Sequence, residues 1–117
     1  MATSGKDLSA YDKSEVPDGE TMRIGIVVSR WNGEITEALY KGAYKTLLDC
    51  GVDSGSILRM DVPGSFELVY GCGKLIRDEK PDAVIAIGSV IRGETAHFDF
   101  VCSATAQGII CLLYTSP

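Results

Sequence analysis

The stretch RIGIVVSRWNG, residues 23–33, shows how this chain is built. Residues 23–29 hold a continuous run of β-branched and small apolar residues, which predicts a strand buried on both faces of a sheet. After a break at residues 30–33, apolar residues recur at helical spacing and predict a helix: Ile35, Ala38, Leu39, Gly42, Ala43, Leu47 and Cys50. Gly51 is expected to end this helix at its C′ position.

A second unit of the same kind follows. Residues 57–62 predict a strand that is closed by a Pro-Gly pair, and Ser65 is expected to cap the helix that comes next. That helix should end at residues 77–81, where charged residues precede a proline. Its expected apolar face consists of Phe66, Val69, Tyr70, Gly73 and Ile76.

The third unit completes the pattern and gives the fold class. Residues 83–87 predict the most apolar strand, and a further helix should begin near Thr95 or Ala96. Strands and helices that alternate with short connections predict an α/β fold, with a parallel sheet between helices on both faces in three αβα layers. Such sheets bind ligands at the carboxyl ends of their strands. Three loops should therefore lie side by side: residues 30–33, 63–67 and 88–97.

Composition narrows the function classes. The 117 residues suffice for one domain, with 45% hydrophobic residues and a formal net charge of −5. Neither nucleic acid nor a membrane is an expected partner, since the chain lacks both a Lys/Arg cluster and a long apolar run. Residues 1–22 are read as an N-terminal arm, which is either a disordered tail or a segment that pairs with a neighbouring subunit. The first 20 residues do not resemble a secretion signal, so a cytoplasmic location is expected.

The cysteine pattern and the glycine motifs exclude several kinds of site. The four cysteines are scattered and never form C-x-x-C, which favours free thiols in a reducing cytosol, and no metal-ligand spacing is present. The loop after the first strand has a single glycine, Gly33, so the dinucleotide fingerprint is absent there. The phosphate-loop motif G-x-x-x-x-G-K-[ST] is absent from the whole sequence.

The third loop, GSVIRGETAHFDF at residues 88–100, is the most informative stretch. It runs from a buried strand into a helix, so Gly93, Glu94 and Thr95 can offer backbone amides to an anion at the helix N-terminus. A strand-to-helix connection that binds no ligand would have the same sequence pattern, so this alternative stays open. His97, the only histidine, can exchange protons near neutral pH, although a histidine that caps or packs is the alternative. Cys102 is excluded as its partner, because five residues separate them by roughly 140° around a helix.

The first two loops also hold candidate binding residues. Trp31 follows the first strand directly, where it can stack on a flat heterocycle or simply cover the sheet. Glu67 lies one turn into the second helix, where it can accept hydrogen bonds from a polyol or favour the helix N-terminus through the dipole. Both alternatives stay open for each residue.

Three blocks of sequence together resemble the lumazine synthase family. They are RWN at residues 30–32, VPGSFE at residues 62–67 and GSVIRGETAH at residues 88–97, and the similarity extends over residues 23–108. The resemblance implies a flavodoxin-like fold, no cofactor and an enzyme of riboflavin biosynthesis. Its reaction would condense 5-amino-6-(D-ribitylamino)uracil with 3,4-dihydroxy-2-butanone 4-phosphate to form 6,7-dimethyl-8-ribityllumazine.

The resemblance also assigns roles to particular residues. Trp31 would stack on the pyrimidine ring, and Glu67 would accept hydrogen bonds from ribityl hydroxyls. His97 would move protons. The remaining residues would bind the substrates: Ser65 and Phe66 the ring and ribityl chain, Ser89, Val90 and Ile91 the pyrimidine through their backbones, and Glu94 and Thr95 the phosphate. The family further implies homopentamers or sixty-subunit shells, with riboflavin synthase as a further partner.

The end of the sequence departs from the family. Residues 23–110 read as a C-terminally truncated lumazine synthase domain, and residues 111–117 read as a non-native tail. The family's later segments supply an arginine for the phosphate, a neighbour's aromatic residue and a lysine, and none of these can be assigned here. We therefore expect this chain alone to be poorly soluble or unassembled, and nearly inactive.

Two other functions remain open at this point. One is a non-catalytic flavodoxin-like module that binds a phosphorylated ligand or a flavin, for which His97 would be dispensable. The other is a purely structural assembly protein, in which changes to Trp31 and Glu67 would affect no ligand.

Overall fold

A computed structural model describes residues 10–94 and 96–115, with side chains described as far as residue 112. Three parallel strands form one sheet in the order β2-β1-β3, where β1 spans Ile24–Ser29, β2 Ile57–Val62 and β3 Ala83–Ile87. Both ladders are in register from the first residue of β1, since Ile24 pairs with Ile57 and with Ala83. The predicted second and third strands are confirmed residue for residue, and the first begins one residue later than expected.

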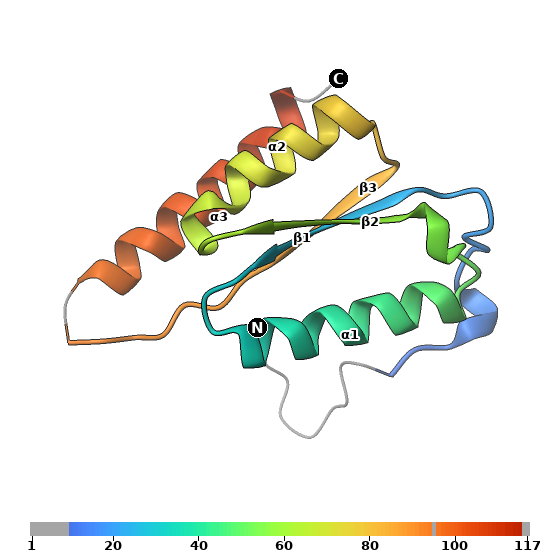
Figure 1. Cartoon of the computed structure of the whole chain (residues 1–117), viewed down its shortest axis with the longest axis horizontal. Helices are drawn as coiled ribbons and strands as arrows, with labels where there is room; N and C mark the ends of the chain where they lie inside the picture. Colours follow the sequence, from blue (N-terminus) through green and yellow to red (C-terminus); the bar gives the residue numbers. More distant parts are fainter. Residues whose placement is uncertain (1–9, 95, 116–117) are drawn as a thin grey trace.

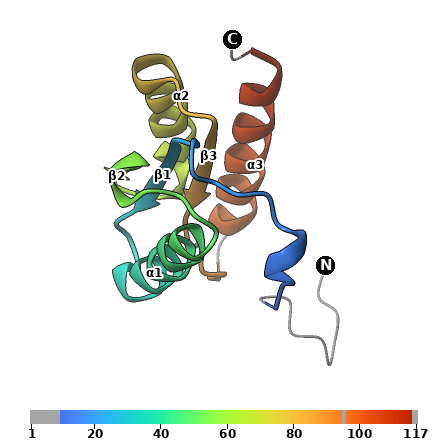
Figure 2. The same ribbon diagram turned by 90° about the vertical axis from the view of Figure 1, so that its right-hand side faces the viewer.

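Helices cover both faces of this sheet (Figure 1). Helix α1, Gly33–Asp49, lies on one face, while α2, Leu68–Glu79, and α3, His97–Thr115, lie together on the other. The end-on view in Figure 2 shows the three layers. The predicted parallel α/β fold is therefore confirmed, and it is consistent with a flavodoxin-like architecture. None of the helices that the structure describes is long and apolar enough to cross a membrane.

The central strand β1 carries the core. All six of its residues are buried, as the continuous apolar run predicted. Ile24, Ile26 and Val28 pack toward α1, and Val27 packs toward α2 and α3. Because successive side chains of a strand point to opposite faces, one short strand anchors two separate hydrophobic clusters.

The buried face of α1 differs from the expected one. Tyr40, Ala43 and Leu47 pack against the sheet and Thr36 is buried, whereas Ile35 and Leu39 are exposed. The helix carries two apolar stripes that share Ala43 and Leu47. Helical spacing alone does not decide which stripe meets the sheet, since that depends on how the preceding loop orients the helix.

The expected face of α2 is partly wrong in the same way. Gly73 is buried as expected, but Leu68, Gly71, Cys72 and Leu75 are buried as well, and Phe66 and Tyr70 are exposed. Ser65 does not cap the helix. It begins a 3₁₀ turn, Ser65–Glu67, and α2 starts only at Leu68, so the helix enters with a different rotation from the one expected.

The ends of the helices agree with the sequence signals. Gly51 has φ +98° directly after the C-cap of α1, a left-handed conformation that favours glycine. Lys80 has φ 48° after α2, just before the proline that was expected to stop it. Helix α3 begins at His97, close to the predicted start; Thr95 lies outside the described residues.

The described part of the N-terminal arm lies against its own chain. The Tyr11 hydroxyl donates to Asp49 Oδ2 at 2.5 Å, and Lys13 Nζ pairs with Asp49 Oδ1 at 3.2 Å. The Gly19 amide donates to the Cys50 carbonyl at 2.9 Å. These contacts fasten the segment before β1 to the carboxyl end of α1.

Candidate functional site

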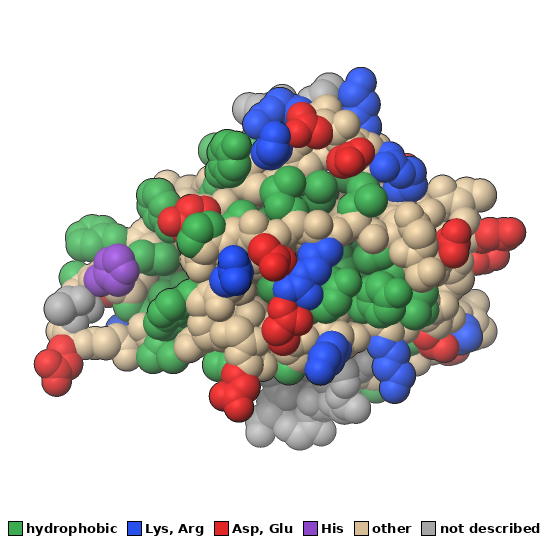
Figure 3. All heavy atoms as spheres, viewed as in Figure 1, with side chains coloured by type: hydrophobic (Ala, Val, Ile, Leu, Met, Phe, Trp, Pro, Cys, Tyr) green, Lys and Arg blue, Asp and Glu red, His purple; other side chains and the backbone are tan. Residues whose placement is uncertain are grey.

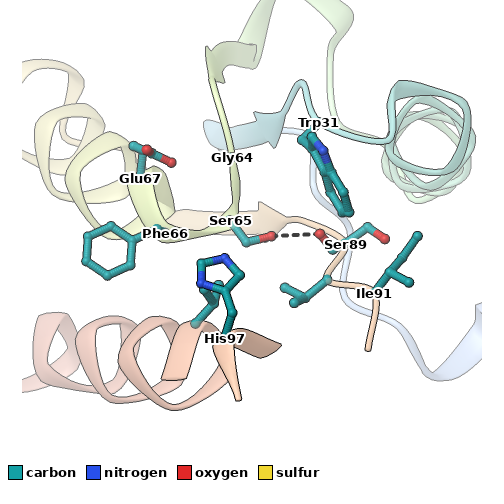
Figure 4. Close-up of a pocket in the computed structure, with 10 residues that line it drawn as sticks. Trp31, Gly64, Ser65, Phe66, Glu67, Ser89, Ile91 and His97 are labelled. Carbon is teal, nitrogen blue, oxygen red and sulfur yellow. Dashed lines mark hydrogen bonds between the residues drawn. The ribbon is translucent and has the colours of Figure 1, made fainter. Parts of the chain in front are cut away.

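A cavity of about 460 Å³ opens at the carboxyl edge of the sheet, where the three predicted loops meet. Figure 4 shows the indole of Trp31 arriving from the β1 side and the imidazole of His97 from the α3 side, with Ser65 and Ser89 between them. The expected juxtaposition of the loops is confirmed. The lining residues are Trp31, Gly64, Ser65, Phe66, Glu67, Ser89, Val90, Ile91, His97 and Val101.

The first loop is held by an extension of the β1–β2 ladder. The Arg30 amide donates to the Val62 carbonyl at 2.8 Å, and the Trp31 amide donates to the Pro63 carbonyl at 3.1 Å. The backbone of Trp31 is therefore fixed beside the second loop. Its side chain stays 50% exposed, so an aromatic face is available at the cavity.

The second loop is a tight turn that places a carboxylate at the cavity. The Glu67 amide donates to the Gly64 carbonyl at 3.2 Å and closes the 3₁₀ turn. The Oε2 atom of Glu67 lies 3.2 Å from the position that a Cβ atom on Gly64 would take. Phe66 is 62% exposed and lines the cavity from the same turn.

Ser65 joins the second loop to the third. Its hydroxyl donates to the Ser89 carbonyl at 3.2 Å, the contact dashed in Figure 4. Gly88 makes this approach possible, because a Cβ atom there would lie 2.6 Å from Ser65 Oγ and 2.8 Å from Leu68 Cδ1. A side chain at residue 88 would separate the two loops.

The third loop leads to His97 at the start of α3. The amides of Asp99 and Phe100 donate to the Ala96 carbonyl at 3.1 and 3.3 Å and begin the helix. His97 is exposed, and in Figure 3 the purple histidine lies at one end of the molecule beside hydrophobic side chains. The ring of Phe98 packs under the Arg92 guanidinium, whose central carbon lies 4.4 Å from the ring centroid.

The structure thus brings together most of the predicted site residues. Glu94 is exposed and does not line the cavity, and Thr95 lies outside the described residues, so their phosphate-binding role stays a prediction. Gly64 and Val101 also line the cavity and are not among the predicted site residues. Val101 lies one helical turn after His97, and its i+4 spacing could have identified it.

Cys102 lies apart from His97, as expected. It lines an adjoining apolar groove along α3 with Thr105 and Ile109, whereas His97 lines the first cavity. Cys50, Cys72 and Cys102 are free thiols. Among the described residues, no cluster of three His, Cys, Asp or Glu side chains is arranged to hold a metal ion.

Comparison with known proteins matches this sequence to a protein family. The family model for 6,7-dimethyl-8-ribityllumazine synthase matches residues 21–116. Proteins named 6,7-dimethyl-8-ribityllumazine synthase are 56% identical in Flavobacterium johnsoniae and 55% identical in Flavobacterium psychrophilum, each over 93% of this chain and 57% or 58% of the relative. That of Parabacteroides distasonis is 50% identical over the whole chain and 74% of its own length. The chain therefore spans somewhat more than half the length of the first two relatives.

Proposed function

Because the chain belongs to the 6,7-dimethyl-8-ribityllumazine synthase family, we propose that its cavity serves the condensation of 5-amino-6-(D-ribitylamino)uracil with 3,4-dihydroxy-2-butanone 4-phosphate. The observation that carries the proposal is the meeting of Trp31, Glu67 and His97 on one cavity, although their loops are far apart in sequence. An aromatic face, a carboxylate and an imidazole are the groups that a flat heterocycle, a polyol chain and a proton-transfer reaction require.

We assign the binding roles that the resemblance to the family implies. Trp31 stacks on the pyrimidine, and Glu67 accepts hydrogen bonds from the ribityl hydroxyls. The backbone of residues 89–91 contacts the pyrimidine edge, and Ser65 and Phe66 complete the pocket for the ring and the ribityl chain. By the same resemblance, Glu94 and Thr95 hold the phosphate. The cavity's size falls in the usual range for small-molecule sites, about 300–1,000 Å³.

His97 moves the protons in this scheme. The uracil amine attacks the ketone and gives an imine and water. Phosphate is then eliminated, and the nitrogen that bears the ribityl chain closes the second ring with loss of another water. Each step transfers a proton between groups held in place by the cavity. One imidazole and accurate positioning therefore account for most of the catalysis.

The test compares wild type with His97→Ala in lumazine formation, using this chain and a version extended to the length of its relatives. We expect the substitution to lower the rate by about 10²- to 10⁴-fold, the usual contribution of a general acid–base. Binding of 6,7-dimethyl-8-ribityllumazine should remain. An unchanged rate in the variant would favour the non-catalytic binding module, and failure of both wild-type forms to bind product would overturn the proposal.

The assembly is part of the same proposal. We propose a cytoplasmic homo-oligomer, a pentamer or a sixty-subunit shell, that works alongside riboflavin synthase. Exposed apolar side chains support association, namely Ile35, Leu39 and Leu48 on α1, Tyr70 on α2 and Phe100 and Ile110 on α3. Light scattering coupled to size exclusion tests it, and a monomer at micromolar concentration in the extended version would contradict it.

A further inference from the structure

Asn32 lies between Trp31 and helix α1 and has an unusual backbone. Its φ and ψ are 58° and 49°, the left-handed region that few residues other than glycine adopt, although asparagine adopts it more readily than most. Its carbonyl accepts the amides of Ile35 and Thr36 at 2.9 and 3.1 Å. Asn32 therefore turns the chain from the Trp31 loop into the first turn of α1.

The side chain of Asn32 does not do what asparagine usually does at this position. An asparagine at a helix N-cap normally has extended backbone and accepts an amide of the first turn. Here the side chain makes no capping hydrogen bond. Instead its Nδ2 atom donates to Ser89 Oγ at 3.4 Å, across 57 positions of sequence.

This contact completes a set of links around the cavity. The backbone of Trp31 is bonded to Pro63, and Ser65 is bonded to the Ser89 carbonyl. Asn32 adds the remaining link, from the first loop to the third. Ser89 thus receives hydrogen bonds from both other loops, one at its hydroxyl and one at its carbonyl.

We propose that Asn32 is a positioning residue of this pocket, whose left-handed backbone and side-chain amide together fix the Trp31 indole relative to the Ser89 loop. It acts through these two residues and does not line the cavity itself. Its effect on ligand affinity rests on the proposed function. Its effect on the position of the Trp31 indole does not rest on that function, because the contacts of Asn32 form without a ligand.

Substitutions at Asn32 can separate the effect of its side chain from the effect of its left-handed backbone. Asn32→Gly keeps the left-handed conformation without strain and removes the amide. Asn32→Asp can keep the link, because its carboxylate can accept a hydrogen bond from the Ser89 hydroxyl. Lys80→Gly is the matched control, since Lys80 is the other non-glycine residue described with positive φ and lies at the opposite edge of the sheet.

The first readout needs no ligand. Trp31 is the only tryptophan, so acrylamide quenching and fluorescence anisotropy report on its indole alone. We expect Asn32→Gly to raise the quenching constant and lower the anisotropy, whereas Asn32→Asp and Lys80→Gly should match wild type. Should Asn32→Gly fail to fold, as judged by circular dichroism, Ser89→Ala removes the same link from its other end and should give the same change.

The second readout is binding of 6,7-dimethyl-8-ribityllumazine by calorimetry. We expect Asn32→Gly to weaken it about fivefold, the effect of one neutral hydrogen bond, and Asn32→Asp to restore it. An indole that responds equally to Asn32→Gly and Lys80→Gly, or to neither, overturns the inference. Absent product binding in wild type would instead count against the proposed function, and the fluorescence comparison would still decide the role of Asn32.

Discussion

The hydroxyl of Ser65 donates to the backbone carbonyl of Ser89 at 3.2 Å, joining the loop after β2 to the loop after β3. These two strands flank β1 and do not pair with each other. Their loops meet because the 3₁₀ turn at Ser65 reaches across the end of the central strand. The Thr105 hydroxyl donates to the Ser65 carbonyl at 3.3 Å and adds α3 to the same junction. This part of the cavity is therefore formed by contacts between the loops after β2 and β3 and helix α3, and no single loop forms it alone.

Gly88→Ala should destabilise the fold, because the new Cβ atom would overlap Ser65 Oγ and Leu68 Cδ1. We expect a loss of about 1–3 kcal/mol in the free energy of unfolding, the usual cost of overpacking, measured by urea denaturation. Gly42→Ala is the control, since nothing lies within 4 Å of its Cβ position in α1. It should stabilise by about 0.5–1 kcal/mol, as alanine does in a helix interior. Equal effects of the two substitutions would contradict the close approach at Gly88.

Trp31→Ala should weaken binding of 6,7-dimethyl-8-ribityllumazine by about 5- to 150-fold, the range for loss of one aromatic stacking partner. Trp31→Phe should keep most of the affinity because it keeps an aromatic face. Calorimetry gives both values. Tyr70→Ala removes another exposed aromatic ring that does not line the cavity, and it should bind as wild type does. Wild-type affinity in Trp31→Ala would show that the indole only covers the sheet.

Glu37→Gln should lower stability in a manner that depends on pH. Hydrogen bonds from the Arg59 guanidinium hold the pKa of the Glu37 carboxyl below its ordinary value of 4.5. A carboxyl with a depressed pKa stabilises the fold above its unfolded pKa, and this contribution is lost as the pH falls through the folded value. Wild type and variant should therefore differ in urea midpoint at pH 7, and the difference should shrink as the pH falls through the folded pKa of Glu37.

The effect at Glu37 should be small, since both partners are partly exposed to solvent. Glu20→Gln serves as control, because Glu20 makes no ion pair among the described residues and its substitution should shift the midpoint little at either pH. A Glu37→Gln difference that persists unchanged into acid would mean that the pair contributes by packing and not by charge.

Cys72 should resist alkylation in the folded protein. It is 3% exposed, and burial raises the pKa of its thiol to about 11. At pH 8 only about one thiol in a thousand would be ionised, and the thiolate is the reactive form. Mass spectrometry after iodoacetamide treatment should show label at the exposed Cys111 well before Cys72. Urea should abolish this difference, and rapid labelling of native Cys72 would contradict its placement in the core.

The sequence by itself determined the three strands, their parallel direction and the edge of the sheet at which the site forms. A strand made of a continuous run of β-branched residues is buried on both faces of its sheet. The carboxyl ends of parallel strands lie at the same edge of that sheet. That is why residues as distant as Trp31 and His97 could be assigned to one cavity before its geometry was known.

Only the tertiary structure decided how the helices face the sheet and what the polar loop residues contact. Ile35 and Leu39 fit an apolar face as well as Thr36 and Tyr40 do, and the structure buries Thr36 in a helix that begins directly after the left-handed residue Asn32. Ser65 reads as a cap but bonds to Ser89 instead. Helical periodicity is a local property, whereas these contacts join residues that the strand order alone brings together.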